Sequence, residues 1–122
     1  DAVVLAGAGL ERLNLAHRIT SRIPIDIMLP AVGQGALAIE ARADDRAVLE
    51  LLGQLEHPPT ATAVAAERAF LGRLQGGCQV PIGALGSIRD DKLELQGFIG
   101  TTDGRHTMRR RREARPAEAV RK

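Results

Sequence analysis

The 122-residue chain has almost no aromatic side chains: it lacks Trp and Tyr, and Phe70 and Phe98 are its only aromatic residues. Hydrophobic residues still make up 44% of the sequence, so the chain can bury a core, which must be packed mainly from Leu, Val, Ile and Ala. The scarcity of rings also argues against a nucleic-acid-binding module that stacks bases on aromatic side chains.

The sequence also lacks the features of disulfide-linked, membrane-spanning or exported proteins. Cys78 is the only cysteine, so no internal disulfide can form. No apolar run approaches the ~20 residues that a membrane-spanning helix needs. Residues 1–10 carry no positive charge ahead of their apolar part, which is not the pattern of a signal peptide. A single free thiol without an export signal predicts cytoplasmic localisation.

Positive charge is concentrated near the C-terminus, in the unbroken run from Arg109 to Arg112, although the net charge is only +2. Basic clusters can bind the phosphate backbone of nucleic acids. Successive residues of a strand point to opposite faces, however, and charged residues are typical of an edge strand that must not pair further. The sequence leaves the role of the run open.

The first residues resemble a strand that is already under way. Residues 3–6 form a short apolar run, which predicts a buried strand. The bend at residues 7–9 leads into a helical turn, where free backbone N–H groups can hold an anion or where glycine simply allows a tight turn. The helix-like pattern of residues 114–122 stops after a few residues, so we expect an internal fragment of a longer protein.

A proline-punctuated connector occupies residues 23–30, where a helix cannot easily continue. Gly33 and Gly35 flank Gln34, so this amide can project from a sharp bend or be an ordinary solvated loop side chain. Residues 36–41 then predict a second strand.

Two helices are predicted next. Asp44 or Asp45 can cap a helix that runs to Leu55. The run HPPT, residues 57–60, breaks the pattern and marks the best domain boundary. Thr60 can cap a second helix, which ends at the following glycine pair. Its predicted apolar stripe consists of Ala63, Ala66, Phe70 and Leu74.

The rest of the chain predicts a three-stranded antiparallel meander. The strands are expected at residues 85–89, 92–100 and 105–112. A turn at residues 90–91 joins the first two, and Asp-Gly at residues 103–104 is a two-residue hairpin signal. Taken with the strands and helices predicted before it, this meander makes the expected fold class of the whole chain α/β and α+β.

The stretch LQGGCQVPIG, residues 74–83, contains the single cysteine. Glycines before Cys78 and Pro81 after it predict an exposed loop. The thiol can be buried and inert, or it can be a reactive group with space for a bulky substituent. No histidine lies in a recognisable nucleophile motif, and one cysteine with scattered histidines predicts no metal site.

Two stretches, LPAVGQGALAIEAR and AAERAFLGRLQGGCQVPIG, resemble the porphobilinogen deaminase (hydroxymethylbilane synthase) family in order and spacing, and so does DAVVLAGAGLERL before them. The resemblance implies a transferase of tetrapyrrole (porphyrin, heme) biosynthesis. Such enzymes join porphobilinogen units head to tail into hydroxymethylbilane and release ammonia. It also implies a cytoplasmic, monomeric enzyme whose dipyrromethane cofactor is attached by a thioether to Cys78.

The same resemblance implies roles for other residues. Gln34 would line the cofactor cleft, and Arg12 would bind the substrate carboxylates, helped by backbone donors of the bend from Ala6 to Gly9. The family's catalytic aspartate is expected in an N-terminal part that precedes this sequence. We therefore expect no catalytic residue here, no metal, no nucleic-acid or membrane partner, and no activity from this fragment alone.

The implied domain plan has three parts, two of them similar to the lobes of periplasmic binding proteins. Residues 1–29 would end the second domain, 30–35 would connect domains, and 36–53 would return to the first domain. After a linker at 54–57, residues 58–122 would form the cofactor-carrying third domain, truncated at its C-terminus. This third domain is expected to be a small α+β unit, a three-stranded antiparallel sheet with helices on one face.

Two alternatives from other functional classes remain at this point. The chain could be a non-catalytic module that binds an anionic ligand, or a basic nucleic-acid-binding module that uses residues 109–112. A pyrrole adduct on Cys78 would distinguish the enzyme from both, and a steep salt dependence of DNA binding would favour the last.

Overall fold

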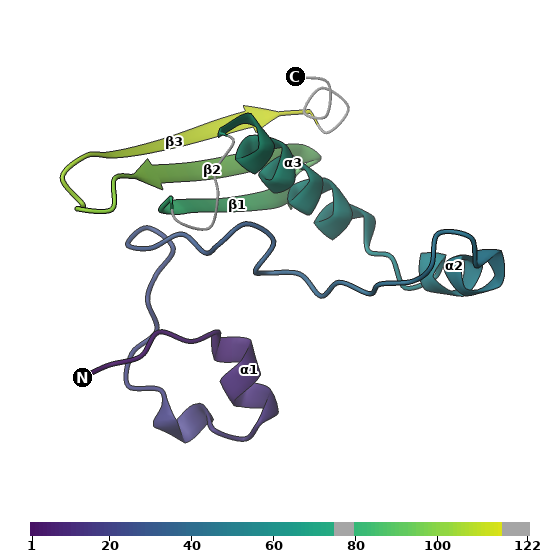
Figure 1. The fold of residues 1–122 in the computed structure, drawn as a ribbon, viewed down its shortest axis with the longest axis horizontal. Coiled ribbons are helices and arrows are strands. Elements are labelled where there is room, and N and C mark those ends of the chain that lie inside the picture. The colour runs from purple at the N-terminus through teal and green to yellow at the C-terminus, as the bar shows by residue number, and fades with distance from the viewer. Residues whose placement is uncertain (75–79, 116–122) are drawn as a thin grey trace.

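The computed structural model describes residues 1–74 and 80–115. Helix α3 packs on a three-stranded sheet, while α1 lies apart from that sheet (Figure 1). In chain order the elements are α1 (Gly7–Arg12), the 3-10 helix η1 (Ala16–Arg18), α2 (Arg46–Gly53), α3 (Pro58–Leu74), β1 (Ile82–Arg89), β2 (Lys92–Gly100) and β3 (Thr107–Ala114). No helix in this described part is both long and apolar enough to cross a membrane.

The sheet is the predicted antiparallel meander, with strand order β1-β2-β3. Asp90 and Asp91 both have positive φ, 48° and 57°, and Arg89 pairs with Lys92 across them. Two successive residues with positive φ form the hairpin turn whose twist matches that of the strands. The turn at residues 90–91 and the bounds of β2 are therefore confirmed, while β1 begins three residues before its predicted start, at Ile82.

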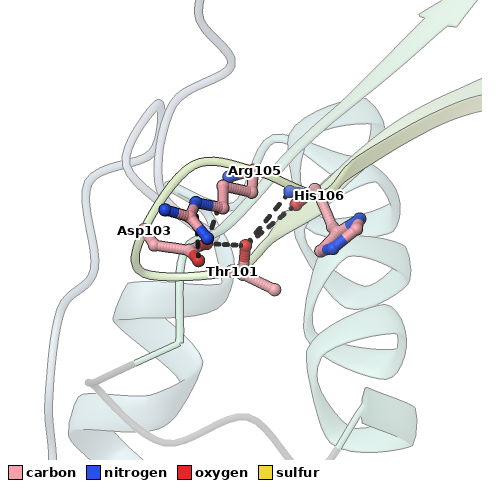
Figure 2. A network of polar contacts seen from close by, with 4 residues as sticks. All are labelled: Thr101, Asp103, Arg105 and His106. Atoms are coloured by element: carbon pink, nitrogen blue, oxygen red, sulfur yellow. Dashed lines mark hydrogen bonds and ion pairs between the residues drawn. The ribbon is translucent and has the colours of Figure 1, made fainter.

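The second hairpin differs from the prediction. Instead of a two-residue turn at 103–104, the loop is closed by a 2.9 Å hydrogen bond from the Thr101 amide to the His106 carbonyl, so β3 begins at Thr107. The Thr101 hydroxyl donates to the Asp103 carboxylate, which also accepts from the Arg105 amide at 3.1 Å (Figure 2). The Thr101 hydroxyl also accepts from the His106 amide at 3.2 Å, so side chains of the loop satisfy two of its amides and favour the longer loop.

The core lies between α3 and the sheet. Ala63 and Ala66 are buried against Leu93, with partly buried side chains around them. The close approach depends on Gly86, because a Cβ there would lie 2.7 Å from the carbonyl oxygen of Ala63. Small residues on both surfaces therefore allow α3 to lie close to the sheet. Leu74, the last residue of the predicted stripe, is 36% exposed and is not part of this buried cluster.

Helix α2 confirms the predicted cap and corrects the predicted end. The Asp45 carboxylate accepts from the Val48 amide at 3.2 Å, which satisfies one of the unpaired amides of the first turn. The helix ends at Gly53, whereas the periodicity predicted an end at Leu55.

Helix α3 begins earlier than predicted. Pro58 is its first residue, a position where the missing N–H costs nothing and the fixed φ is already helical. The Ala61 amide donates to the His57 carbonyl at 3.0 Å. Thr60 is therefore inside the helix and does not cap it; its hydroxyl lies 2.8 Å from Nδ1 of His57 instead.

The strands predicted at residues 3–6 and 36–41 are wrong. Both segments lie outside any strand, with Val3 78%, Leu37 92% and Ile39 63% exposed. An apolar run forms a strand only when another strand pairs with it, and no other described strand does so here.

The sheet with α3 packed on it confirms the predicted small α+β unit. The periplasmic-binding-protein-like architecture and the domain bounds stay predictions.

Candidate functional site

Residues 30–35, the predicted connection between domains, lie along the free edge of β1. The Pro30 carbonyl accepts a 3.0 Å hydrogen bond from the Ala84 amide of that strand. Since β2 is the only described strand that pairs with β1, the outward-facing amides of β1 need other acceptors. The connection is therefore docked on the sheet.

A buried carboxylate fixes the same segment a second time. Glu67, in α3, is only 5% exposed and accepts from the Gly33 amide through Oε2 and from the Gly86 amide through Oε1, each at 2.7 Å. Hydrogen bonds to an ionised carboxylate are roughly twice as strong as those between neutral groups. Glu67 thus ties together α3, the connection and the edge of β1.

Sequence reasoning missed Glu67, although a signal was present. The residue lies four positions after Ala63 and three before Phe70, inside the stripe predicted to face the core. Residues at these spacings share one face of a helix. A charged side chain is almost never fully buried unless it has a partner, so its place in that stripe indicated a specific contact.

Gln34 is exposed on a turn next to the glycine that Glu67 holds. The Gln34 amide donates to the Ala31 carbonyl at 3.0 Å, and the Ala36 amide donates to the Gly33 carbonyl at 3.3 Å. These two bonds fix the backbone on both sides of Gln34 while its side chain remains accessible. An exposed side chain on a turn fits both interpretations of Gln34, the projecting amide and the solvated loop residue, and its role toward a cofactor stays a prediction.

A groove of about 270 Å³ lies beside the place where Glu67 contacts the connection and β1. Its lining includes Gly35, His57, Thr60, Val64, Glu67 and Ser87. No Lys or Arg of the described residues lines it, so it is poorly suited to bind substrate carboxylates. Within residues 1–74 and 80–115 there is also no group of three or more His, Cys, Asp or Glu side chains placed to hold a metal ion.

Cys78, in the predicted loop, lies outside the described residues, but the residues before and after residues 75–79 are described. Leu74 ends α3 on one side. On the other side, the Pro81 carbonyl accepts from the Gly100 amide at 2.9 Å, directly before β1 begins. Helix α3 therefore precedes Cys78 and strand β1 follows it, and Glu67 links both of these elements to Gly33.

Arg12 and the bend before it belong to a different part of the structure. Arg12 is the exposed last residue of α1 and forms no ion pair with any other described residue. The Gly9 amide donates to the Ala6 carbonyl at 3.1 Å, so the Gly7 and Ala8 amides are the ones that lack an intrahelical acceptor. Helix α1 lies apart from the sheet (Figure 1), and no hydrogen bond or ion pair joins Arg12 to Gln34 in the part of the chain that the structure describes.

Both halves of the sequence match models of one protein family. Residues 61–121 match the C-terminal domain of porphobilinogen deaminase, and residues 1–50 match the dipyrromethane cofactor-binding domain of porphobilinogen deaminase. Arg12 and Gln34 lie in residues 1–50, and Cys78 lies in residues 61–121.

Curated relatives agree with the family models. The porphobilinogen deaminase of Desulforudis audaxviator is 56% identical over 118 residues, 97% of this chain and 38% of the relative. That of Pelotomaculum thermopropionicum is 54% identical over 109 residues, 89% of this chain and 35% of the relative. That of Moorella thermoacetica is 56% identical over 108 residues, which are 88% of this chain and 34% of the relative. The chain thus spans 34% to 38% of the length of these relatives.

Proposed function

Because the chain belongs to the porphobilinogen deaminase family, we propose that it is part of a transferase that joins porphobilinogen units head to tail into hydroxymethylbilane and releases ammonia. The observation that carries this proposal is the match of residues 1–50 and residues 61–121 to two different domains of the same family. The activity is proposed for the longer protein, since the chain covers little more than a third of its relatives.

We propose further that a dipyrromethane cofactor is attached to Cys78 through a thioether. The residues present suit such a group: Cys78 is the only thiol, and the exposed Gln34 lies on a segment held by Glu67 to both elements that flank the cysteine loop. When bound, the cofactor supplies the pyrrole end to which substrate units are added. The thiol then serves as an anchor and needs no general base once the thioether exists.

The other proposed contacts concern carboxylates. Porphobilinogen carries acetate and propionate arms, which suit the exposed guanidinium of Arg12, because arginine binds carboxylates through two parallel hydrogen bonds. The bend from Ala6 to Gly9, before the other end of α1, would supply further backbone donors, and its Gly7 and Ala8 amides lack an intrahelical acceptor. Gln34 would contact the ligand from the separate connection at residues 30–35, as an amide that can both donate and accept.

The intact mass of the full-length protein tests this assignment. We expect a mass increase that corresponds to a dipyrromethane, and consumption of porphobilinogen with release of ammonia. Cys78→Ser should lose the mass increase and the activity, while Ser87→Ala, which alters a residue of the neighbouring strand, should keep both. A pyrrole adduct that persists in Cys78→Ser would refute the anchor.

The same measurement distinguishes the alternatives. An unmodified protein that binds anionic pyrroles without releasing ammonia would be a ligand-binding module. Binding to DNA with a steep dependence on salt would indicate the nucleic-acid-binding module. No contact among the described residues favours either one.

A further inference from the structure

One arginine of the run 109–112 differs from the other three. Arg109 is half-buried, whereas Arg110, Arg111 and Arg112 are exposed. Its Nη2 donates to the Ile25 carbonyl at 2.7 Å, and its Nη1 donates to the Asp26 carbonyl. These partners are 84 and 83 residues away in the chain. Arg109 therefore makes a long-range contact and is not only a solvated residue of the edge strand.

The two carbonyls are available because of a local turn. The Ile27 and Met28 amides both donate to the Pro24 carbonyl, at 3.1 and 3.0 Å. A helical turn of this kind leaves its next carbonyls, here those of Ile25 and Asp26, without a backbone donor. Such carbonyls carry partial negative charge, and arginine side chains cap them.

The guanidinium is itself held in place from the sheet. Its Nη2 also lies 2.9 Å from Oε1 of Gln96, an acceptor on the adjacent strand β2. Arginine is suited to this position because its rigid fork of five N–H donors can serve several acceptors at once. A lysine ammonium would have the charge but not the planar geometry.

The contact belongs to a row that crosses the sheet. Gly83, Phe98 and Arg109 are neighbours on β1, β2 and β3. Gly86 faces α3, and alternate strand residues point to opposite faces, so this row lies on the other face. At its β1 end, a Cβ on Gly83 would lie 3.1 Å from Cβ of the buried Leu29.

Residues 25–30 thus cross the second face of the sheet, from Arg109 on β3 to Gly83 on β1. They continue directly into the connection at residues 30–35, which runs beside β1 in Figure 1. Arg109 holds one end of this path, and Glu67 holds the other end at Gly33. Gln34 follows immediately after the second anchor.

We propose that Arg109 is a positioning residue. By anchoring residues 25–30 across the sheet, its guanidinium sets the place of Gln34 relative to the elements that flank Cys78. The catalytic consequence rests on the proposed function. A misplacement of about 1 Å from a change outside the reacting groups can cost up to about a hundredfold in rate, so loss of this anchor should slow the reaction without removing a substrate contact.

Hydrogen exchange of the full-length protein tests the anchor directly. Arg109→Gln should increase exchange of the amides of residues 25–35 about tenfold and leave that of β2 unchanged, because the opening is local. Arg109→Lys should give a smaller increase and guards against loss of folding in the first variant. Arg112→Gln, an exposed arginine of the same strand, is the matched control and should change nothing.

Kinetics test the positioning role. Arg109→Gln should lower kcat about tenfold while KM for porphobilinogen stays within about twofold, since this side chain does not touch substrate. The mass of the Cys78 adduct should be unchanged. A purely structural contact would alter exchange and not kcat, and that result would overturn the positioning role. Unchanged exchange in both Arg109 variants would overturn the anchor itself.

Failure of the proposed function gives a different result. A wild-type protein that consumes no porphobilinogen would refute the transferase and, with it, the catalytic consequence of Arg109. The exchange of residues 25–35 would still decide whether Arg109 anchors them.

Discussion

The Glu67 carboxylate and the Gly33 amide lie 2.7 Å apart, although 34 residues separate them in the chain. The other oxygen of the same carboxylate accepts from the Gly86 amide. One side chain therefore satisfies two backbone donors from two segments, and a single substitution should affect both. This makes Glu67 a sensitive position for testing how the connection at residues 30–35 is held.

Glu67→Gln should destabilise the full-length protein by about 1–3 kcal/mol. The glutamine amide has one acceptor oxygen, so its NH₂ group must face one of the two N–H donors and leave that donor unpaired. The shift of the urea midpoint measures this loss. Glu50→Gln, at an exposed position of α2, should leave the midpoint unchanged. Equal midpoints for both variants would contradict the double acceptor role.

Gly86→Ala should also destabilise the protein, by about 1–3 kcal/mol, because α3 would have to move away from the sheet. The new Cβ would lie 2.7 Å from the Ala63 carbonyl oxygen, and this is backbone that cannot simply change rotamer. Gly72→Ala is the matched control, since a Cβ there meets nothing within 4 Å. That change should stabilise α3 by up to ~1 kcal/mol, because alanine favours a helix more than glycine does. Thermal unfolding of the two variants should thus shift in opposite directions.

The sheet could be predicted from the sequence because its signals are local. Apolar and polar residues alternate along β2, and Asp90-Asp91 is chemically suited to its turn. For residues 3–6 and 36–41 such local signals were not enough. Their apolar runs are compatible with strands, but a strand also needs a partner, and no partner is present among the described residues.

The long-range contacts could not be predicted in the same way. Arg109 looked like one of four equivalent charges, and its residue type does not reveal carbonyl partners more than 80 residues away. Glu67 was detectable as a charge in an apolar stripe, but its partners Gly33 and Gly86 are backbone groups that any residue provides. The roles of Arg12, Gln34 and Cys78 came from family resemblance and stay predictions.

Arg12→Leu should weaken substrate binding far more than it affects folding. The side chain is exposed, so its loss removes little packing, whereas a charge-assisted contact to a carboxylate contributes about 1.5–3 kcal/mol. KM for porphobilinogen should therefore rise by about one to two orders of magnitude. Arg18→Leu, an exposed arginine of η1, should leave KM unchanged. Identical kinetics for wild type and Arg12→Leu would remove Arg12 from the substrate site.

The loop between β2 and β3 should respond to acid through Asp103. The hydrogen bond from the Thr101 hydroxyl, assisted by the Arg105 amide, lowers the pKa of Asp103 from its ordinary value of 3.8. Because the folded-state pKa is the lower one, the carboxylate stabilises the loop above pH 3.8, and this contribution is lost as the pH falls through the folded-state pKa.

Thr101→Val removes the principal cause of that shift, so the pKa of Asp103 should rise toward its ordinary value. An NMR titration of the Asp103 carboxyl carbon in the full-length protein measures the change. Thr102→Val, one residue along the same loop, is the control and should leave the pKa of Asp103 where it is in the wild type. If Thr101→Val and Thr102→Val titrate alike, the Thr101 hydroxyl does not hold the carboxylate, and the longer loop must owe its shape to the backbone bond between Thr101 and His106.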